Sequence, residues 1–212
     1  MADIYATRSA SEASSSDHPQ LSQVLRHLSL NAGAQITLRE LAHAMGERSF
    51  GALLVVFALP NLIPLPPGAT FILGLPLIFV AWQMVVSHRD QIWLPKKMGD
   101  YAFDNATFFV FINRISPWLM KAETLIRPRG WFPVGRLAER IVGLLALALA
   151  VVIFLPIPFG NWLPAFALAV IGFAQTERDS LALVAGTLIG LFALAIASLV
   201  VLTAGAVVTL LI

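Results

Sequence analysis

The sequence predicts an all-α membrane protein that packs together two copies of one helix–proline turn–helix hairpin. Two observations predict this fold class: long stretches without charge, and a pattern that recurs 92 residues further along the chain. Hydrophobic residues make up 58% of the 212 residues and charged residues only 12%, whereas about 25% of an ordinary soluble domain is charged. A single globular core of this size cannot hide that imbalance from water.

Three blocks of the sequence lack Asp, Glu, Lys and Arg altogether: 49–88, 141–176 and 180–212. Each is longer than the roughly 20 apolar residues that cross the hydrocarbon core of a bilayer. We therefore expect all three blocks to lie in lipid. The sequence contains no cysteine, which excludes disulfides, thiolate nucleophiles and cysteine-ligated metals.

The two hairpin copies align when the sequence is shifted by 92 residues without a gap. Nine of 37 aligned positions are identical, against about three expected by chance for so biased a composition. Residue types that are rare in these apolar stretches carry most of the matches. The matches pair Glu47-Arg48 with Glu139-Arg140, Gly51 with Gly143, Leu53 with Leu145, Ala58 with Ala150, Pro64 with Pro156, Pro66 with Pro158, Gly68 with Gly160, and Gln83 with Gln175.

A Pro-x-Pro-x-Gly break interrupts each copy. Proline removes a helical hydrogen bond and clashes with the preceding turn, so the first helix of each copy should end at about Leu62 and Phe154. A first arm of about 14 residues spans roughly 21 Å, which is short of a hydrocarbon core of about 30 Å. The turn is therefore expected within the depth of the membrane, as a re-entrant or broken hairpin. The sequence leaves open whether the two copies run parallel or inverted.

The rest of the chain divides by composition. Residues 1–16 are too polar to fold and are expected to be disordered. Residues 17–48 carry two amphipathic helices at the cytoplasmic face or the interface, the second opened by a capping box from Thr37 to Glu40. The expected order is then a first membrane hairpin at 49–88, a basic aromatic segment at 89–138, a second hairpin at 139–179, and C-terminal membrane helices at 180–212.

The stretch from Ser87 to Arg140 contains nine basic and five acidic residues, with aromatic residues interleaved. The positive-inside rule places this stretch in the cytoplasm or at the cytoplasmic interface. One interpretation is an interfacial belt whose basic side chains snorkel toward water. The other is recognition of an anionic lipid head group. The sequence leaves both open.

Motifs for common catalytic chemistry are missing from the sequence. It has no glycine-rich phosphate loop ending in Lys, no His-Glu-x-x-His and no Gly-x-Ser-x-Gly, and its four histidines stand at no metal-ligand spacing. No carboxylate lies inside an apolar block, which removes the usual proton relay of a pump. The sequence therefore predicts no catalytic residue, no metal, no cofactor and no enzymatic activity.

The polar residues that remain inside the two hairpins are uncharged. Asn61 and Asn161 flank the two breaks on opposite sides, as expected if both reach into a common cavity. The competing interpretation is that each amide caps a frayed helix end. The predicted substrate-binding or cavity residues are Asn61, Pro64, Pro66, Gly68, Gln83, Pro156, Pro158, Gly160, Asn161 and Gln175.

Charged pairs stand where the apolar arms begin and end. They could act as gates at the mouths of the cavity, or as interfacial anchors that screen one another. These residues are Glu47, Arg48, Arg89, Asp90, Glu139, Arg140, Arg178 and Asp179.

The chain resembles the exopolysaccharide synthesis ExoD family over roughly residues 20–200. The family pattern usually has Gly after the last Asp, where this chain has Ser180. The resemblance implies a polytopic inner-membrane protein linked to exopolysaccharide production, and it implies no catalytic residue. It rests on Thr37-Leu38-Arg39-Glu40-Leu41, Gly46-Glu47-Arg48, Ala58-Leu59-Pro60-Asn61, Pro64-Leu65-Pro66-Pro67-Gly68, Gly74-Leu75-Pro76-Leu77, Gln83-Met84, Trp93-Leu94-Pro95, Leu155-Pro156-Ile157-Pro158-Phe159-Gly160-Asn161 with Leu163-Pro164, and Glu177-Arg178-Asp179.

Two functions are consistent with these features. The first is a transporter- or flippase-like protein for a lipid-linked or small anionic substrate, because broken hairpins build substrate sites in transporters. The second is a non-transporting membrane scaffold for polysaccharide synthesis partners. A lipid-modifying enzyme lacks an evident nucleophile, base or metal site. The expected partners are the phospholipid bilayer, an anionic lipid or polyprenyl-linked intermediate, and a second copy in a homodimer, for which Gly186 and Gly190 have suitable spacing; no nucleic acid is expected.

Overall fold

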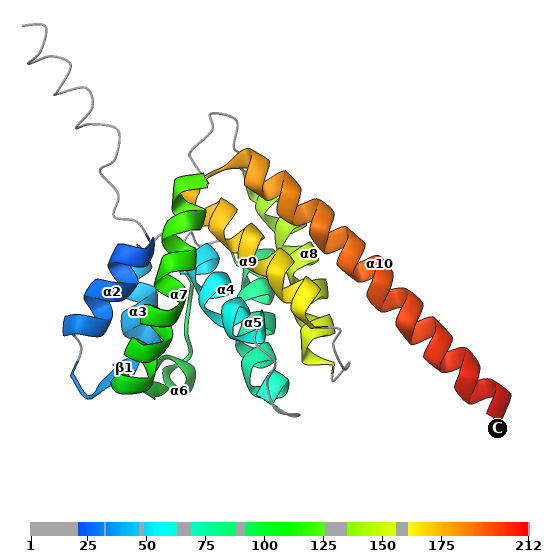
Figure 1. Ribbon diagram of the computed structural model, residues 1–212, viewed down its shortest axis with the longest axis horizontal. Helices are drawn as coiled ribbons and strands as arrows, with labels where there is room; N and C mark the ends of the chain where they lie inside the picture. The colour runs from blue at the N-terminus through cyan, green and yellow to red at the C-terminus, as the bar shows by residue number, and fades with distance from the viewer. Residues whose placement is uncertain are drawn as a thin grey trace, which may run out of the picture.

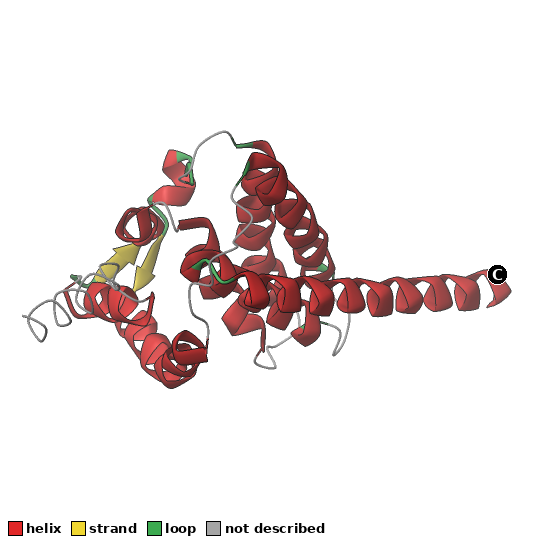
Figure 2. Ribbon diagram, turned by 90° about the horizontal axis from the view of Figure 1, so that it is seen from above, coloured by secondary structure: helices red, strands yellow, loops and turns green. Residues whose placement is uncertain are grey.

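The computed structural model describes residues 21–31, 33–46, 49–62, 69–87, 92–125, 135–155 and 161–211. Over these residues the chain is almost entirely helical, which confirms the all-α class, and one short pair of strands is added to it (Figure 2). The elements are α2 (Leu21–Asn31), β1 (Gln35–Thr37), α3 (Leu38–Met45), α4 (Ser49–Ala58), the 3-10 helix η2 (Leu59–Leu62), α5 (Ala69–Val86), α6 (Lys96–Gly99), β2 (Ala102–Asp104), α7 (Asn105–Leu125), α8 (Arg136–Phe154), α9 (Trp162–Glu177) and α10 (Ser180–Leu211).

The elements α2, α3, α6, α7, β1 and β2 pack together into what we call the N-terminal unit. Strands β1 and β2 pair antiparallel, with Ile36 opposite Phe103. The sequence did not predict this pair, because three-residue strands that lie far apart in the chain leave no alternating pattern to recognise. The amphipathic character expected of the first two helices is present: Leu21, Leu25 and Leu41 are buried in the unit.

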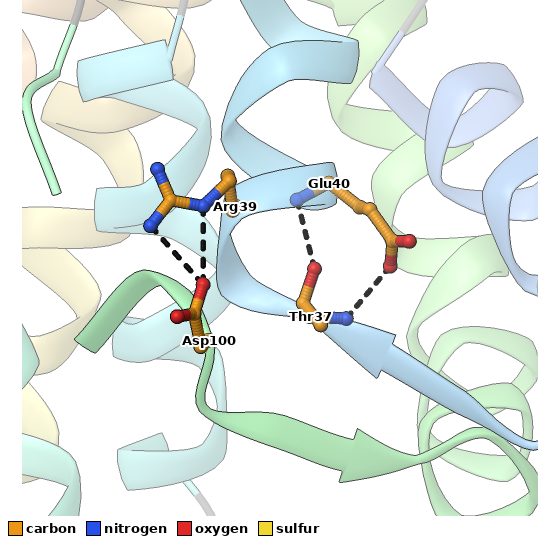
Figure 3. A network of polar contacts seen from close by, with 4 residues as sticks. All are labelled: Thr37, Arg39, Glu40 and Asp100. Carbon is orange, nitrogen blue, oxygen red and sulfur yellow. Dashed lines mark hydrogen bonds and ion pairs between the residues drawn. The ribbon is translucent and has the colours of Figure 1, made fainter. Parts of the chain in front are cut away.

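The capping box predicted at the start of α3 is present (Figure 3). The backbone N–H of Glu40 donates to Thr37 Oγ1 at 3.2 Å, and the backbone N–H of Thr37 donates to the Glu40 carboxylate at 2.9 Å. Arg39 lies between the two capping-box residues in sequence. Its Nη2 lies 3.1 Å from Asp100 Oδ1, and this ion pair connects α3 to the segment between α6 and β2. Both partners of that ion pair are well exposed, so it contributes at most about 1 kcal/mol.

Four helices, α4, α5, α8 and α9, form a bundle beside the N-terminal unit (Figure 1). Each packs against two others: α4 against α5 and α9, and α8 against α5 and α9. The C-terminal end of α8 and the N-terminal ends of α5 and α9 lie at the same, lower end of the bundle in Figure 1. The helix ends that flank the two breaks therefore lie at one end of the bundle.

Two close contacts hold the opposite end of the bundle together. A Cβ added at Gly51 in α4 would lie 2.6 Å from the Gly172 carbonyl oxygen and 2.7 Å from Thr176 Oγ1, both in α9. A Cβ added at Gly143 in α8 would lie 2.9 Å from Met84 Cβ in α5. Gly143 follows Gly51 by 92 residues and Thr176 follows Met84 by 92 residues. Each first arm thus crosses the second arm of the other hairpin at corresponding positions.

Helix α4 is buried along nearly its whole length. Apart from Ser49, all of its residues are apolar. Its ten residues span roughly 15 Å at 1.5 Å per residue, about half of a hydrocarbon core of about 30 Å. Helices α3, α5 and α9 surround it. A helix that is apolar on all sides belongs in the interior of a protein or in lipid, and here protein covers it.

Helix α10 is a single continuous helix of 32 residues, rather than two short ones. Its first half packs on α9 and α8, and its second half runs beyond the bundle (Figures 1 and 2). A Cβ added at Gly186 would lie 2.9 Å from Ile171 Cγ1, and one added at Gly190 would lie 2.9 Å from Leu149 Cδ1. The two glycines with small-residue spacing are therefore used for close helix packing within the chain.

Two helices of the described chain are long and apolar enough to cross a membrane: Leu137–Phe154 in α8 and Ser180–Thr203 in α10. The segments Ser49–Leu62 and Phe71–Val86 are also apolar but shorter. Many apolar side chains on the outer faces of α5, α8 and α10 are exposed, including Ile72, Leu144 and Leu188. Such faces are expected on helices that lie in lipid.

Candidate functional site at the two helix breaks

Asn61 lies in η2, where α4 tightens into a 3-10 turn before the first break. Its side chain is 5% exposed. The amide nitrogen donates to the Phe57 carbonyl oxygen at 2.8 Å, so it satisfies one of the carbonyls that a helix end leaves without a partner. The amide oxygen is buried and has no hydrogen-bond partner.

Asn161 stands at the start of α9, directly after the second break. It occupies the N-cap position but makes no side-chain capping bond to α9. Its amide nitrogen instead donates backwards to the Ile153 carbonyl oxygen at 3.1 Å, near the end of α8. Its amide oxygen, like that of Asn61, is buried without a hydrogen-bond partner.

The capping interpretation accounts for the nitrogen of each asparagine, and the common cavity remains a prediction. Each nitrogen caps the end of a first arm, as the capping interpretation predicts. Each oxygen is a buried acceptor without a protein hydrogen-bond partner, and leaving such a group unsatisfied costs about 1–3 kcal/mol. A buried acceptor that persists at such a cost can accept a hydrogen bond from water or from a ligand donor.

Gln83 has a different role from the one that the sequence suggested. Its side chain is 5% exposed, its Oε1 accepts from the backbone N–H of Trp93 at 2.9 Å, and its Nε2 donates to the carbonyl oxygen of the same residue. Both ends of the amide are used, so Gln83 holds the segment after α5 against that helix. The sequence marked Gln83 as a polar amide late in an apolar arm. It could not show that the partner of this amide is the backbone of Trp93.

Gln175 is half-buried in α9 and cannot repeat that clamp. The position that corresponds to Trp93, 92 residues on, is Ala185, which lies inside α10. The backbone groups of a residue within a helix already bond to their own helix. The identity of the two glutamines in sequence therefore does not give them the same environment.

The charged pairs separate into surface groups and a buried cap. Glu139 and Arg140 are exposed in the first turns of α8. The partial positive charge of the helix N-terminus favours the carboxylate of Glu139 there. Arg178 is exposed and adopts a left-handed conformation with φ 53° at the end of α9. Asp179 is 1% exposed, and its Oδ1 accepts from the backbone N–H groups of Leu181 and Ala182 at 2.9 and 3.2 Å. Asp179 therefore caps α10.

Ten of the predicted site residues lie outside the described residues. They comprise the two Pro-x-Pro-x-Gly breaks and the charged residues before and after the first hairpin. These residues are Glu47, Arg48, Pro64, Pro66, Gly68, Arg89, Asp90, Pro156, Pro158 and Gly160.

Other polar groupings in the described residues are sparse. No cluster of three or more His, Cys, Asp or Glu that could hold a metal ion occurs there. A shallow cleft of about 420 Å³ opens between the end of α2 and the start of α7. It is lined by Ser29, Leu30, Gly33, Ala34, Asp104, Asn105, Ala106 and Phe109, and it belongs to the N-terminal unit rather than to the breaks.

The apolar helices and the bundle define a class: this is an all-α membrane protein in which an asparagine amide stands beside each of two helix breaks. The chain belongs to the exopolysaccharide synthesis ExoD family, whose sequence profile matches residues 21–199. That membership confirms the resemblance found in the sequence and assigns the chain a role in exopolysaccharide synthesis.

Two curated relatives are similar to this chain. An uncharacterized protein of Synechocystis sp., slr1875, is 30% identical over 158 residues, which cover 73% of each protein. Protein ExoD of Rhizobium meliloti is 30% identical over 159 residues, which cover 73% of this chain and 65% of that protein, just under two thirds of its length. No solved structure matches the chain.

Proposed function

We propose that this chain is a multi-pass protein of the bacterial inner membrane that supports exopolysaccharide synthesis or export as a transporter- or flippase-like protein. Its substrate on this proposal is a lipid-linked or small anionic molecule, and no enzymatic step is part of it. The observation that carries the proposal is the pair of buried, unbonded amide oxygens of Asn61 and Asn161, one at each helix break. The name of the Rhizobium relative, ExoD, and the family description support the link to exopolysaccharide.

The proposal includes an internal repeat of two broken hairpins. The contacts of Gly51 with Thr176 and of Gly143 with Met84 support it. Gly143 is the repeat partner of Gly51 and Thr176 that of Met84, and such an exchange of partners is the pattern of a two-fold relation. The helix ends that flank the two breaks lie at the same end of the bundle, which favours parallel copies related by an axis along the bundle. The shortness and burial of α4 favour a re-entrant first arm.

The chemistry of the two breaks suits a substrate that combines negative charge with hydroxyl groups. The N-terminal ends of α5 and α9 both face the breaks, and helix N-termini carry partial positive charge that favours anions. The oxygens of Asn61 and Asn161 can only accept hydrogen bonds, so they suit hydroxyl donors. A sugar phosphate attached to a lipid offers both groups, which is why we favour a lipid-linked saccharide over a simple inorganic anion.

The proposal is tested with purified protein in liposomes that contain a fluorescent polyprenyl-linked sugar in one leaflet. We expect the parent chain to speed the movement of the probe between leaflets, and Asn61→Leu or Asn161→Leu to slow it about 2- to 10-fold each, the loss of one ordinary hydrogen bond. Arg26→Gln, an exposed change on α2, is the matched control. No movement above protein-free liposomes, or full rates in both Asn variants, would contradict the proposal.

The alternative is a non-transporting scaffold that holds synthesis partners. The lack of any Asp, Glu, Lys or Arg in the blocks 49–88, 141–176 and 180–212 favours it, since transporters commonly couple through ionisable groups in the membrane. A scaffold would leave probe movement at the background rate while its deletion still lowered polysaccharide output. Restoration of output by both Asn variants would further favour the scaffold.

A further inference from the structure

The outer face of α7 is unusually apolar for a helix that lies on the surface. The inner face packs Phe108, Ile112 and Leu119 into the N-terminal unit. On the other side, exposed side chains recur at the spacing of one helical face, and Val110 and Trp118 are 66% and 73% exposed. The outer face, as we use the term, consists of Phe109, Val110, Arg114, Pro117, Trp118, Met120 and Lys121, all of them exposed.

The charge on this outer face has a single sign. Between Ala106 and Ala122 the charged residues are Arg114 and Lys121 alone, with no Asp or Glu. Lys121 Nζ lies 5.8 Å from the centre of the Trp118 ring, a cation–π contact that holds the cation beside the apolar surface. Exposed aromatic and aliphatic groups with interspersed cations are the pattern of a helix that lies in the interface of an anionic bilayer.

The chain keeps α7 close to a bilayer. Only residues 126–135 separate the end of α7 at Leu125 from the start of α8 at Arg136, and ten residues reach at most about 36 Å when fully extended. Helix α8 contains one of the two segments that are long and apolar enough to cross a membrane. The outer face of α7 therefore stays within reach of lipid head groups.

We propose that the outer face of α7 binds the surface of an anionic bilayer, with Val110, Trp118 and Met120 in the interface and Arg114 and Lys121 on lipid phosphates. Apolar burial alone would not distinguish lipid from a protein partner. The two cations of the outer face favour lipid, because each basic residue near an anionic surface strengthens binding about fivefold. This inference does not depend on the proposed transport, since its readout is the position of α7.

The test uses the full chain, whose lack of cysteine makes a single label specific. Val110→Cys carries a nitroxide, and its collision rates with oxygen and with a water-soluble nickel complex are measured in vesicles of phosphatidylcholine with or without phosphatidylglycerol. Met120→Cys is the second labelled position and Gln23→Cys, exposed on α2, is the water-exposed reference. We expect oxygen contact and nickel protection at positions 110 and 120, stronger in the anionic vesicles, and neither at position 23.

The cations are then removed one at a time. Arg114→Gln and Lys121→Gln should each lower the ratio of membrane-bound to free α7 about fivefold in anionic vesicles, and Arg26→Gln should leave it unchanged. High salt should weaken the effect, because about 1 M salt shortens the screening length to about 3 Å. Nickel access at position 110 equal to that at position 23, or protection that is the same with and without phosphatidylglycerol, would overturn the proposal.

Discussion

The side chains of Asn61 and Asn161 each do half of the bonding that a buried amide can do. The nitrogen is bonded to a helix-end carbonyl and the oxygen is not bonded. Replacing either residue with Leu loses one hydrogen bond, worth about 0.5–1.5 kcal/mol, but also removes an unsatisfied buried acceptor that costs about 1–3 kcal/mol. The lost hydrogen bond lowers the free energy of unfolding and the removed acceptor raises it. The net change should therefore be smaller than for the loss of an ordinary helix cap.

We therefore predict that Asn61→Leu and Asn161→Leu change the free energy of unfolding by no more than about 1 kcal/mol while polysaccharide output falls. Melting in detergent and polysaccharide output from a deletion strain carrying each variant measure the two effects. A parallel loss of stability and output would instead favour a purely structural cap for both residues.

Arg178 and Asp179 form the junction between α9 and α10 and should respond in opposite directions. Asp179→Ala removes a helix cap and should lower stability by about 0.5–2 kcal/mol. Arg178→Gly relieves a left-handed conformation that costs an L-residue roughly 1–2 kcal/mol, and the flexibility of Gly offsets part of that gain. We expect a small rise in melting temperature for Arg178→Gly. A gate role for Arg178 requires output to fall in this more stable variant, whereas an anchor role predicts unchanged output.

Glycines bring the first arms close to the second arms where the two cross. Gly51→Ala places a methyl group 2.6 Å from a backbone oxygen of α9, and Gly143→Ala places one 2.9 Å from Met84 Cβ and 3.1 Å from Val85 N of α5. Backbone cannot move aside without shifting the helix, so each change should cost about 1–3 kcal/mol. Gly33→Ala, which meets nothing within 4 Å, is the control in the same melting experiment, and equal stability of all three variants would contradict this account of the crossing.

Helix positions were predictable from sequence where local chemistry decides them, and less so where distant partners do. The capping box of α3 and the helix ends near Leu62 and Phe154 follow from side-chain bonding and proline sterics within a few residues. The β1–β2 pair and the Gln83 clamp on Trp93 depend on backbone groups that only the folded chain brings close. Asn61 and Asn161 stood out in the sequence because an amide is rare in apolar blocks. That each amide is bonded through its nitrogen and not through its oxygen is visible only in the folded chain.

A homodimer remains a proposal for the whole molecule, with a changed rationale. The close-packing glycines of α10, Gly186 and Gly190, contact α9 and α8 within the chain, so they are not free for a second copy. The distal part of α10, with Leu199, Val201 and Leu202 exposed, is the surface that we assign to a second copy. We predict a dimer mass in native mass spectrometry, lost when Val201 and Leu202 are changed to Ala. A monomer mass for the parent chain in mild detergent would contradict it.

The arrangement of the bundle makes a prediction about the two breaks. The C-terminal end of α8 and the N-terminal ends of α5 and α9 lie at one end of the bundle in Figure 1, and η2 packs against α5 and α9. Irregular backbone in lipid costs several kcal/mol for each unsatisfied group, so it must be covered by protein or line a cavity. Cysteine introduced at Gly68 or at Gly160 should therefore react slowly with an impermeant thiol reagent, compared with cysteine at Gln23 on α2. Any residual labelling should come from the same side of the membrane at both positions. Rapid labelling at both would contradict the buried breaks, and labelling from opposite sides would contradict the parallel relation of the two hairpins.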